Sequence, residues 1–175
     1  MRDGTSISEL DVQCAQNNLE ALAAILWDCV EGGASVSFMW PFDMGQSLSY
    51  WSGVISALTE NRLRLFAAWY NGRLGGTVQL WLDGPCNQQH RADIRKLLVH
   101  RAFRRQGMAR DLMRHAEAEA RAMGRSLLTL DTVTGGPAER LYEQLAWQRV
   151  GVIPKFAKWP DGRFCDTTVL FKDIE

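Results

Sequence analysis

The amino-acid sequence predicts an α/β protein with a mixed central β-sheet. Its first half has the pattern of a strand, two helices and a β-hairpin, and its second half alternates strands with helices before two closing strands. A strand, a helix and a second strand in succession form parallel neighbours joined by a right-handed crossover. Because 175 residues with 46% hydrophobic side chains can build a core without disulfides or metals, we expect one domain over residues 1–175.

Two helices follow the first strand in the N-terminal half. Segment 5–12 alternates as a strand does, and segment 17–33 places apolar residues at helical spacing before a Gly-Gly stop. The aromatic segment 35–45 is interrupted by a proline and is expected to be a loop. Segment 47–60 returns to a helical pattern, which completes the order strand, helix, helix.

The middle of the chain predicts three further strands. Segment 62–83 contains two β-rich runs around Asn71-Gly72, the strongest short signal for a hairpin. Segment 93–99 is a strand whose alternation breaks at residues 97–99. A continuous apolar run of this kind indicates burial on both faces or a β-bulge, so we place the strand centrally in the sheet.

A helical pattern begins after Gly107 and opens the last third of the chain. This helix ends at Gly124, which fits a C-terminal cap. One stripe of this helix is apolar, while Arg114, Glu117 and Arg121 are expected to face water, the last two as a favourable i,i+4 pair. The remaining elements are a strand at 126–132, a helix at 137–147, and closing strands at 148–153 and 167–174. The predicted element order is therefore βααββ, then βαβα, then ββ.

Charge and cysteine content exclude several classes of partner. The 20 basic and 20 acidic residues cancel, so nothing favours a nucleic acid or an anionic membrane surface as partner. No segment reaches the roughly 18 unbroken apolar residues of a membrane span. The four cysteines lie apart and lack metal-ligand spacing, so we expect reduced thiols, no metal and a cytoplasmic location.

An arginine-rich loop precedes the helix after Gly107. A strand that enters a helix through a glycine loop leaves the first backbone N–H groups of the helix unpaired at the positive end of its dipole. Such a helix start binds anions, and four arginines surround it: Arg101, Arg104, Arg105 and Arg110. No Walker A or G-x-G-x-x-G pattern is present. We expect a diphosphate here, and the alternative is a solvated basic helix start.

The segment RRQGMA resembles the R/Q-x-x-G-x-G/A motif of the GNAT superfamily of acyl-coenzyme A-dependent N-acyltransferases, with Arg104, Gly107 and Ala109 at the pattern positions. AERLYEQLAW is similar to a second motif, A-x-x-L-Y-x-x-x-G-F, and the order of the elements matches over nearly the whole chain. The resemblance implies the GNAT fold, in which the two parallel central strands splay apart. It also implies acetyl-CoA-dependent N-acetyltransferase activity.

The same resemblance implies where acetyl-CoA binds. Its diphosphate would lie on the loop and helix start, and its pantetheine arm would pair like an added strand along residues 97–99. From the broken alternation of that strand, we hypothesise that a backbone N–H near Leu97 or Leu98 polarises the thioester carbonyl. The residues implied for cofactor binding are Leu97, Leu98, Val99, Arg104, Arg105, Gln106, Gly107, Met108, Ala109 and Arg110.

Two side chains are candidates for the chemistry of acetyl transfer. Tyr142 occupies the tyrosine position of the second motif, where the family's tyrosine donates a hydrogen bond or a proton to the coenzyme sulfur; the alternative is an aromatic that only packs. Asp131 ends a strand beside the expected splay and is the first choice for the base. Because a carboxylate is a weak base toward an ammonium, Asp131 could act through water or hold the ammonium, and Asp93 is the alternative.

The acceptor is expected to be the amine of a small molecule. Aromatic residues Trp40, Phe42 and Trp81 are candidates for the pocket walls, together with Asp131. Segment 130–174 resembles the toxin-resistance branch of the superfamily, which acetylates tabtoxin or tabtoxinine-β-lactam, although Gly135 stands where many members carry an asparagine and Ala146 replaces a glycine. A protein N-acetyltransferase of the same fold is the alternative, and the sequence leaves monomer and homodimer open.

Overall fold

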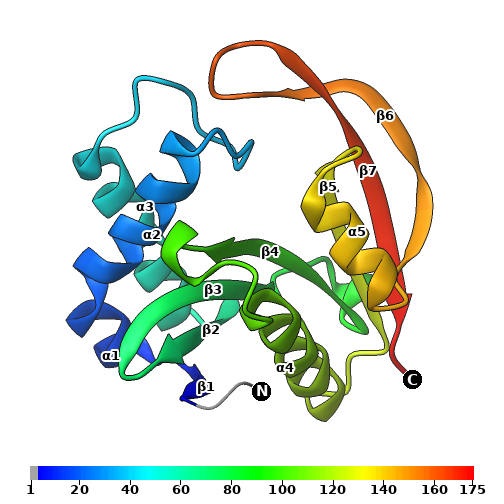
Figure 1. Ribbon diagram of the computed structural model, residues 1–175. Helices are drawn as coiled ribbons and strands as arrows, with labels where there is room; N and C mark the ends of the chain where they lie inside the picture. Colours follow the sequence, from blue (N-terminus) through cyan, green and yellow to red (C-terminus); the bar gives the residue numbers. More distant parts are fainter. Residues whose placement is uncertain (1–3) are drawn as a thin grey trace.

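A seven-stranded mixed sheet forms the centre of the protein in a computed structural model, which describes residues 4–175 (Figure 1). The strands lie in the order β1-β2-β3-β4-β5-β7-β6, and β4 and β5 are the pair that runs parallel. This arrangement confirms the predicted α/β class and mixed sheet. The strands are β1 (Thr5–Glu9), β2 (Leu63–Tyr70), β3 (Arg73–Trp81), β4 (Arg91–Val99), β5 (Leu127–Val133), β6 (Gln148–Lys158) and β7 (Phe164–Asp173).

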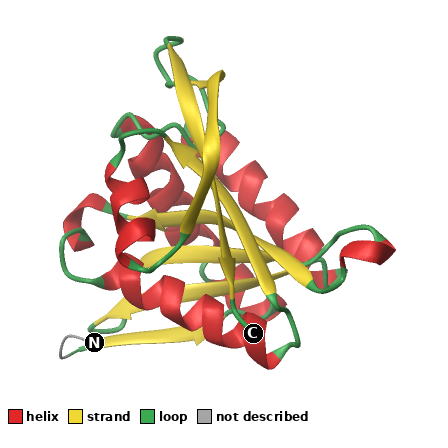
Figure 2. Ribbon diagram, turned by 90° about the vertical axis from the view of Figure 1, so that its right-hand side faces the viewer, coloured by secondary structure: helices red, strands yellow, loops and turns green. Residues whose placement is uncertain are grey.

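Helices cover both faces of the sheet (Figure 2). One apolar cluster joins one face of the sheet to α1 (Val12–Asn17), α2 (Leu19–Glu31) and α3 (Met44–Thr59). A second cluster joins the other face to α4 (Met108–Ala122) and α5 (Pro137–Gln144). Figure 1 shows α1 to α3 grouped apart from α4 and α5. Two short 3-10 turns, Cys86–Gln88 and Arg101–Phe103, flank β4.

The N-terminal elements differ from the prediction in two places. The expected strand ends early, at Glu9, because Asp11 accepts a hydrogen bond of 2.7 Å from the backbone N–H of Cys14 and so begins α1. This short helix was not predicted. The second difference is that α3 begins three residues earlier than expected, because Asp43 and Gln46 form a reciprocal capping box.

The β2–β3 hairpin and the bulge in β4 follow the sequence pattern. Asn71 and Gly72 both have positive φ, at 49° and 74°, as a two-residue hairpin turn of this type requires. In the next ladder, Thr77 pairs with Leu98 and Gln79 pairs with Arg95, so residues 96 and 97 of β4 together face the single residue 78 of β3. The broken alternation of this central strand is therefore a β-bulge.

The parallel strands β4 and β5 pair over only a short stretch. Arg91 to Asp93 align with Leu127 to Thr129, and no further pairs between the two strands follow in the described chain. Beyond this point β5 continues to pair with β7 as far as Val133. The two central strands therefore diverge, which confirms the predicted splay and leaves the backbone of residues 94–99 without a β5 partner.

Glu117 on α4 corrects a prediction, because its side chain is buried rather than directed to water. It accepts a hydrogen bond of 2.8 Å from Trp147 Nε1 and one of 2.6 Å from Lys172 Nζ. The expected pair with Arg121 is replaced by a hydrogen bond of 2.7 Å from Arg121 Nε to the Ile174 carbonyl. The physical reason is that the end of β7 and the chain after α5 pack against this side of α4.

Candidate active site

The start of α4 forms an open cluster of backbone donors. Gly107 is the N-cap residue, its φ is +86°, and no side chain caps this helix end. The first helical hydrogen bond runs from Asp111 N to Gly107 O at 3.0 Å, so the N–H groups of the first turn have no partner within the helix. A Cβ at Gly107 would meet no atom within 4 Å. An anion can therefore approach the backbone closely, and the residues present fit a diphosphate.

The loop before α4 is anchored by the buried carboxylate of Asp28 in α2. Arg101 donates to Asp28 through its backbone N–H at 2.9 Å and through Nε. Arg104 lies with one guanidinium nitrogen 3.7 Å from Asp28 and donates through Nε to the Val99 carbonyl at 2.9 Å. Arg101 was expected to supply charge beside the anion, and its guanidinium is instead paired with this buried carboxylate. These two arginines fix the shape of the loop.

Arg105 and Arg110 are exposed beside the helix start, and neither forms an ion pair with a side chain of residues 4–175. Arg110 has one contact of 3.3 Å, to Gln144 Oε1. Gln106 donates to the Ala102 carbonyl at 3.4 Å. Met108 is buried and Ala109 half-buried, so the helix start offers mainly backbone at these two positions.

Residues 97–99 of β4 lie where this strand separates from β5. Leu98 is buried in the cluster on the α1–α3 side, whereas Leu97 and Val99 pack at the edge of the cluster on the α4 side. Their side chains are therefore occupied in packing. On the side that faces away from β3, their backbone has no strand partner in the described chain, although the Val99 carbonyl already accepts from Arg104 Nε. An extended ligand can pair along this edge, as the family resemblance implied for the pantetheine arm.

Tyr142 of α5 is buried, with 6% of its surface exposed, and its ring centroid lies 6.0 Å from that of Trp147. Burial raises the pKa of the Tyr142 hydroxyl well above its ordinary value, and the negative charge of Asp131 raises it further. The phenol therefore keeps its proton at neutral pH. It can donate a hydrogen bond to the coenzyme sulfur, whereas the raised pKa makes transfer of the proton itself less favourable.

Asp131 lies on β5 past the last residue that pairs with β4, and its side chain is exposed. Its charge acts on two groups. It contributes to the raised pKa of Tyr142, and it opposes the effect of burial, which lowers the pKa of Lys96. Asp131 is therefore close enough to both side chains to influence their protonation.

The alternative base, Asp93, lies at the paired end of β4 and β5. It forms ion pairs with Arg91 at 2.6 Å and with Arg95 at 3.2 Å, and it accepts a hydrogen bond from Thr129. Both oxygens of the Asp93 carboxylate are therefore already engaged by side chains of the protein. These contacts favour Asp131 over Asp93.

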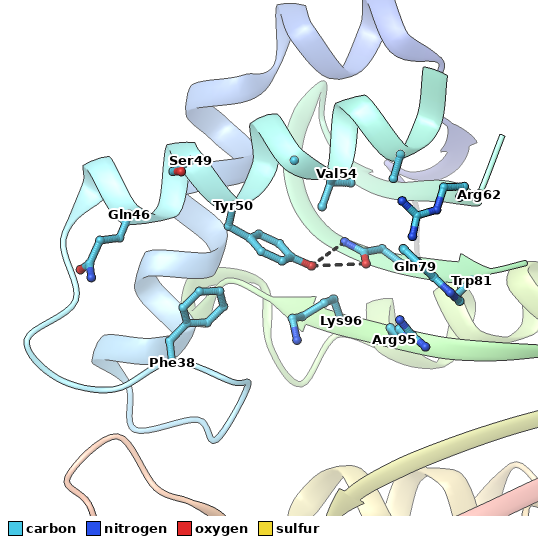
Figure 3. A pocket seen from close by; sticks show the side chains of 12 residues that line it. Phe38, Gln46, Ser49, Tyr50, Val54, Arg62, Gln79, Trp81, Arg95 and Lys96 are labelled. Atoms are coloured by element: carbon cyan, nitrogen blue, oxygen red, sulfur yellow. Dashed lines mark hydrogen bonds between the residues drawn. The ribbon is translucent and has the colours of Figure 1, made fainter. Parts of the chain in front are cut away.

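A cleft of about 680 Å³ lies between α3 and the strands β3 and β4 (Figure 3). The Tyr50 hydroxyl meets the Gln79 amide in it, 3.0 Å from Nε2, and burial raises the pKa of Tyr50 to about 12. Because the cleft opens on the α1–α3 side of the sheet, it lies on the opposite face from α4. Its walls include Phe38, Tyr50, Gln79, Trp81, Arg95 and Lys96.

Of the aromatic residues predicted for the acceptor pocket, Trp81 lines this cleft. Phe42 is buried in the core, 4.7 Å from the ring of Phe38. Trp40 donates through Nε1 to the Val30 carbonyl at 3.1 Å. Lys96, which sequence reasoning missed as a wall of the cleft, lies in the bulge that the broken alternation of β4 had indicated.

The loop between α2 and α3 is tied to the tip of the β6–β7 hairpin. Ser35 Oγ donates to the Lys158 carbonyl at 2.7 Å, and the backbone N–H of Trp40 donates to the Pro160 carbonyl at 3.0 Å. Figure 1 shows the hairpin arching from the far end of the sheet toward this loop. The same loop supplies Phe38 to the cleft, so the hairpin helps to fix one of its walls.

The described part of the chain contains no candidate metal centre. Within residues 4–175, no three His, Cys, Asp or Glu side chains lie close enough together to hold an ion. The four cysteines are free thiols: Cys14, Cys29, Cys86 and Cys165. None of the helices in this part of the chain has both the length and the apolar character needed to cross a membrane.

A comparison with models of protein families identifies the family of this chain. The model of the acetyltransferase (GNAT) family matches residues 19–147. The protein belongs to the GNAT acetyltransferase family. This match includes the arginine loop, the start of α4 and Tyr142, and it confirms the family that RRQGMA and AERLYEQLAW predicted.

Several solved structures have the same fold, and their matches extend over nearly the whole of this GNAT protein. A candidate acetyltransferase from Salmonella typhimurium with its cofactor acetyl-CoA has a TM-score of 0.79 and 17% identity, and the match covers 99% of this chain and 95% of that chain. Ribosomal-protein-alanine N-acetyltransferase from Brucella melitensis has a TM-score of 0.81 and 19% identity over 96% and 99%. A candidate phosphinothricin N-acetyltransferase has a TM-score of 0.78 and 18% identity over 98% and 99%.

The structure shows the local surroundings of the two residues that depart from the GNAT sequence pattern. Ala146 stands where the motif usually has glycine, and its φ of +62° is in the left-handed region that glycine adopts most easily. Gly135 stands where many members carry an asparagine, and its backbone N–H donates to the buried carboxylate of Glu139. The backbone of Gly135 is therefore used to fix the turn before α5.

Proposed function

We propose that the protein transfers an acetyl group from acetyl-CoA to the amine of a small molecule in the cytoplasm, with residues 1–175 as one N-acetyltransferase domain. The observation that carries this proposal is the placement of two sites around β4. The open start of α4 lies on one face of the sheet, the cleft lies on the other, and both reach the part of β4 that has separated from β5.

The chain's own residues account for how acetyl-CoA would be held. The N–H groups of the first turn of α4 would receive the diphosphate, with Arg105 and Arg110 beside it. The backbone of residues 97–99 would pair with the pantetheine arm. Bound acetyl-CoA supplies an acetyl thioester, and the Salmonella typhimurium protein of the same fold was solved with this cofactor.

The transfer requires several bond changes that these residues can assist. After the acceptor ammonium loses one proton, its nitrogen attacks the thioester carbonyl carbon and forms the C–N bond, while an N–H near Leu97 or Leu98 stabilises the oxyanion. The C–S bond then breaks. Tyr142 donates a hydrogen bond to the leaving thiolate, which takes its proton from water, and Asp131 orients the amine and passes the second amine proton to water.

The acceptor that we propose is a small antibiotic or toxin amine such as tabtoxinine-β-lactam. A cleft of about 680 Å³ matches a compact ligand, and the loop that borders it is tied to the β6–β7 hairpin at Ser35 and Trp40. The candidate phosphinothricin N-acetyltransferase of the same fold supports a small acceptor. The Brucella melitensis protein, by its name an enzyme acting on a ribosomal protein, supports protein N-acetylation as the second candidate.

A screen for release of free coenzyme thiol tests this function. The purified protein is incubated with acetyl-CoA and single amines, including tabtoxin, tabtoxinine-β-lactam and aminoglycosides, and separately with peptides that present a free N-terminus or a lysine. We expect thiol release with at least one small amine. If thiol is released only with peptides or intact proteins, the second candidate replaces the first.

We also propose an oligomeric state for the protein. A homodimer is the alternative to a monomer, and exposed apolar side chains on the outer strand β6 support it, among them Val150 and Phe156. Sedimentation equilibrium over a range of protein concentrations distinguishes the two states.

A further inference from the structure

We propose that the cleft selects an amine that also carries a carboxylate, and that Lys96 is the residue that binds this carboxylate. The inference rests on the proposed acetyltransferase function and narrows its substrate class to amino acids and related zwitterions. Simple amines and polyamines, which lack an anionic group, would be poor acceptors.

All the charged side chains that line the cleft are basic. Among the 12 residues that line it, Arg62, Arg95 and Lys96 are basic and none is acidic. The whole chain has no net charge, so this is a local concentration of positive charge. A cationic polyamine entering the cleft would meet like charges, whereas an anionic group would be attracted.

Two of the three basic residues already form ion pairs. Arg62 pairs with Glu60 at 3.3 Å and with Asp83 at 2.8 Å, and Arg95 pairs with Asp93 at 3.2 Å. Both guanidinium groups also lie over the ring of Trp81 in the cleft, at 5.1 and 4.4 Å from its centroid. These contacts hold the two arginines in place, and each already has an acidic partner.

Lys96 differs because it forms no ion pair with any side chain of residues 4–175. Its Nζ donates to Ser37 Oγ at 3.1 Å and lies 6.0 and 5.8 Å from the ring centroids of Phe38 and Tyr50. Burial lowers the pKa of Lys96, because the contacts around Nζ do not fully compensate the charged form for its loss of solvent. A bound carboxylate would supply the missing partner.

The backbone holds Lys96 at the position where an acceptor would have to lie. Its φ is +49°, in the left-handed region, because it belongs to the bulge in β4. Residues 97–99, the proposed track of the pantetheine arm, follow directly. Asp131 on the diverging strand β5 is the acidic group that acts on Lys96 through its charge. A zwitterion could therefore place its carboxylate at Lys96 and its ammonium toward Asp131.

The test compares each acid with its own carboxamide. The common L-amino acids and their carboxamides are offered with acetyl-CoA to the wild-type enzyme and to Lys96→Met. We expect kcat/KM of the wild type to fall roughly tenfold or more from acid to carboxamide, the order expected when a charge-assisted hydrogen bond is lost. In Lys96→Met the value for the acid falls more than the value for the carboxamide, so that the ratio of the two approaches one. Lys96→Arg should retain the preference for the acid.

Lys155→Met is the matched control, because Lys155 is an exposed lysine with a similar φ of +54° outside the cleft. Melting temperatures of all variants check that they fold. Equal kcat/KM for acids and carboxamides in the wild type, or an equal loss for both in Lys96→Met, would overturn the proposal.

A binding measurement separates this proposal from the proposed function. Calorimetric titration of the protein with L-phenylalanine and with its carboxamide needs no turnover. If no amine releases thiol, the proposed function is wrong, yet tighter binding of the acid that disappears in Lys96→Met would still support a carboxylate site. If the protein binds the acid and the carboxamide with equal affinity and also turns them over with equal kcat/KM, a carboxylate site at Lys96 is excluded.

Discussion

The carboxylate of Asp28 accepts a hydrogen bond of 2.9 Å from the backbone N–H of Arg101, and this contact joins α2 to the loop that begins α4. Asp28 also binds the Arg101 guanidinium and lies 3.7 Å from that of Arg104. The carboxylate is nearly inaccessible, with 4% of its side chain exposed. The shape of the proposed diphosphate site therefore depends on a residue of the opposite helical layer.

Asp28→Ala is expected to destabilise the protein and to weaken cofactor binding. The variant loses charge-assisted hydrogen bonds that contribute about 1.5–3 kcal/mol each, and the freed loop would no longer present the α4 start. Urea unfolding and calorimetric titration with acetyl-CoA measure the two effects. Glu31→Gln, an exposed change near the end of the same helix, is the control. Unchanged acetyl-CoA affinity in Asp28→Ala would contradict the anchoring role.

Gly107→Ala is expected to raise KM for acetyl-CoA roughly tenfold, because a Cβ would occupy the open space through which the anion reaches the backbone. The same change also forces alanine into the left-handed region, at a cost of about 1–2 kcal/mol. Gly124→Ala is the matched control, since Gly124 has a φ of +74°, lies after the other end of α4 and also has open space around it.

Steady-state kinetics and urea unfolding of both glycine variants decide this prediction. Both should lose similar stability, and only Gly107→Ala should lose affinity. A parallel rise in KM in the two variants would point to strain in α4 rather than to an anion site.

Tyr142→Phe is expected to lower kcat by about 10- to 100-fold and to leave KM for acetyl-CoA unchanged, because the ring still packs while the donor to the sulfur is lost. Tyr70→Phe, on β2, tests whether removal of any phenol has this effect. Stopped-flow measurement of thiol release gives kcat. A variant with full turnover would leave Tyr142 with a packing role alone.

Stability is expected to fall at alkaline pH through the buried phenols. Tyr50 has a pKa of about 12 in the folded protein against 10.0 ordinarily, so between these values the unfolded chain binds fewer protons. Its contribution is complete below pH 10 and is lost as pH rises toward 12, at no more than about 1.4 kcal/mol per pH unit. Urea unfolding across this pH range should show that the free energy of unfolding falls less steeply with pH in Tyr50→Phe than in the wild type. The same pH dependence in both proteins would refute a raised pKa at Tyr50.

Glu117 and Lys172 are expected to be energetically coupled. Lys172→Met leaves the Glu117 carboxylate buried beside Trp147 without its counter-charge, at a cost of about 3–5 kcal/mol. Adding Glu117→Gln removes that charge and keeps an acceptor for Trp147 Nε1, so the double variant should be more stable than the sum of the single losses indicates. Urea unfolding of the four proteins measures the coupling, which additive losses would disprove.

Local patterns in the sequence predicted most of the fold because they report on residues close in the chain. The Asn71-Gly72 turn, the broken alternation before Val99 and the glycine before α4 each appear as expected. The element order and the splay followed from these signals together with the family resemblance. The start of α1 at Asp11 was missed because one capping residue interrupts a strand-like pattern.

Contacts between distant segments could not be predicted in this way. Asp28 precedes Arg101 by 73 positions, so nothing in the arginine loop indicates that a buried carboxylate neutralises part of it. Glu117 has the helical position of a solvated residue and is buried only because Lys172 and Trp147 reach it from other elements. The position of Lys96 in the cleft likewise depends on α3, which the pattern of β4 does not describe.

The divergence of β4 from β5 past Asp93 bears on the order of events during turnover. Under the proposed function, acetyl-CoA approaches from the α4 face and the acceptor from the α3 face, so each has its own entrance. Neither substrate blocks the other, and the acetyl group can pass directly between them without first being stored on a side chain. The two products can likewise depart by separate exits, in either sequence.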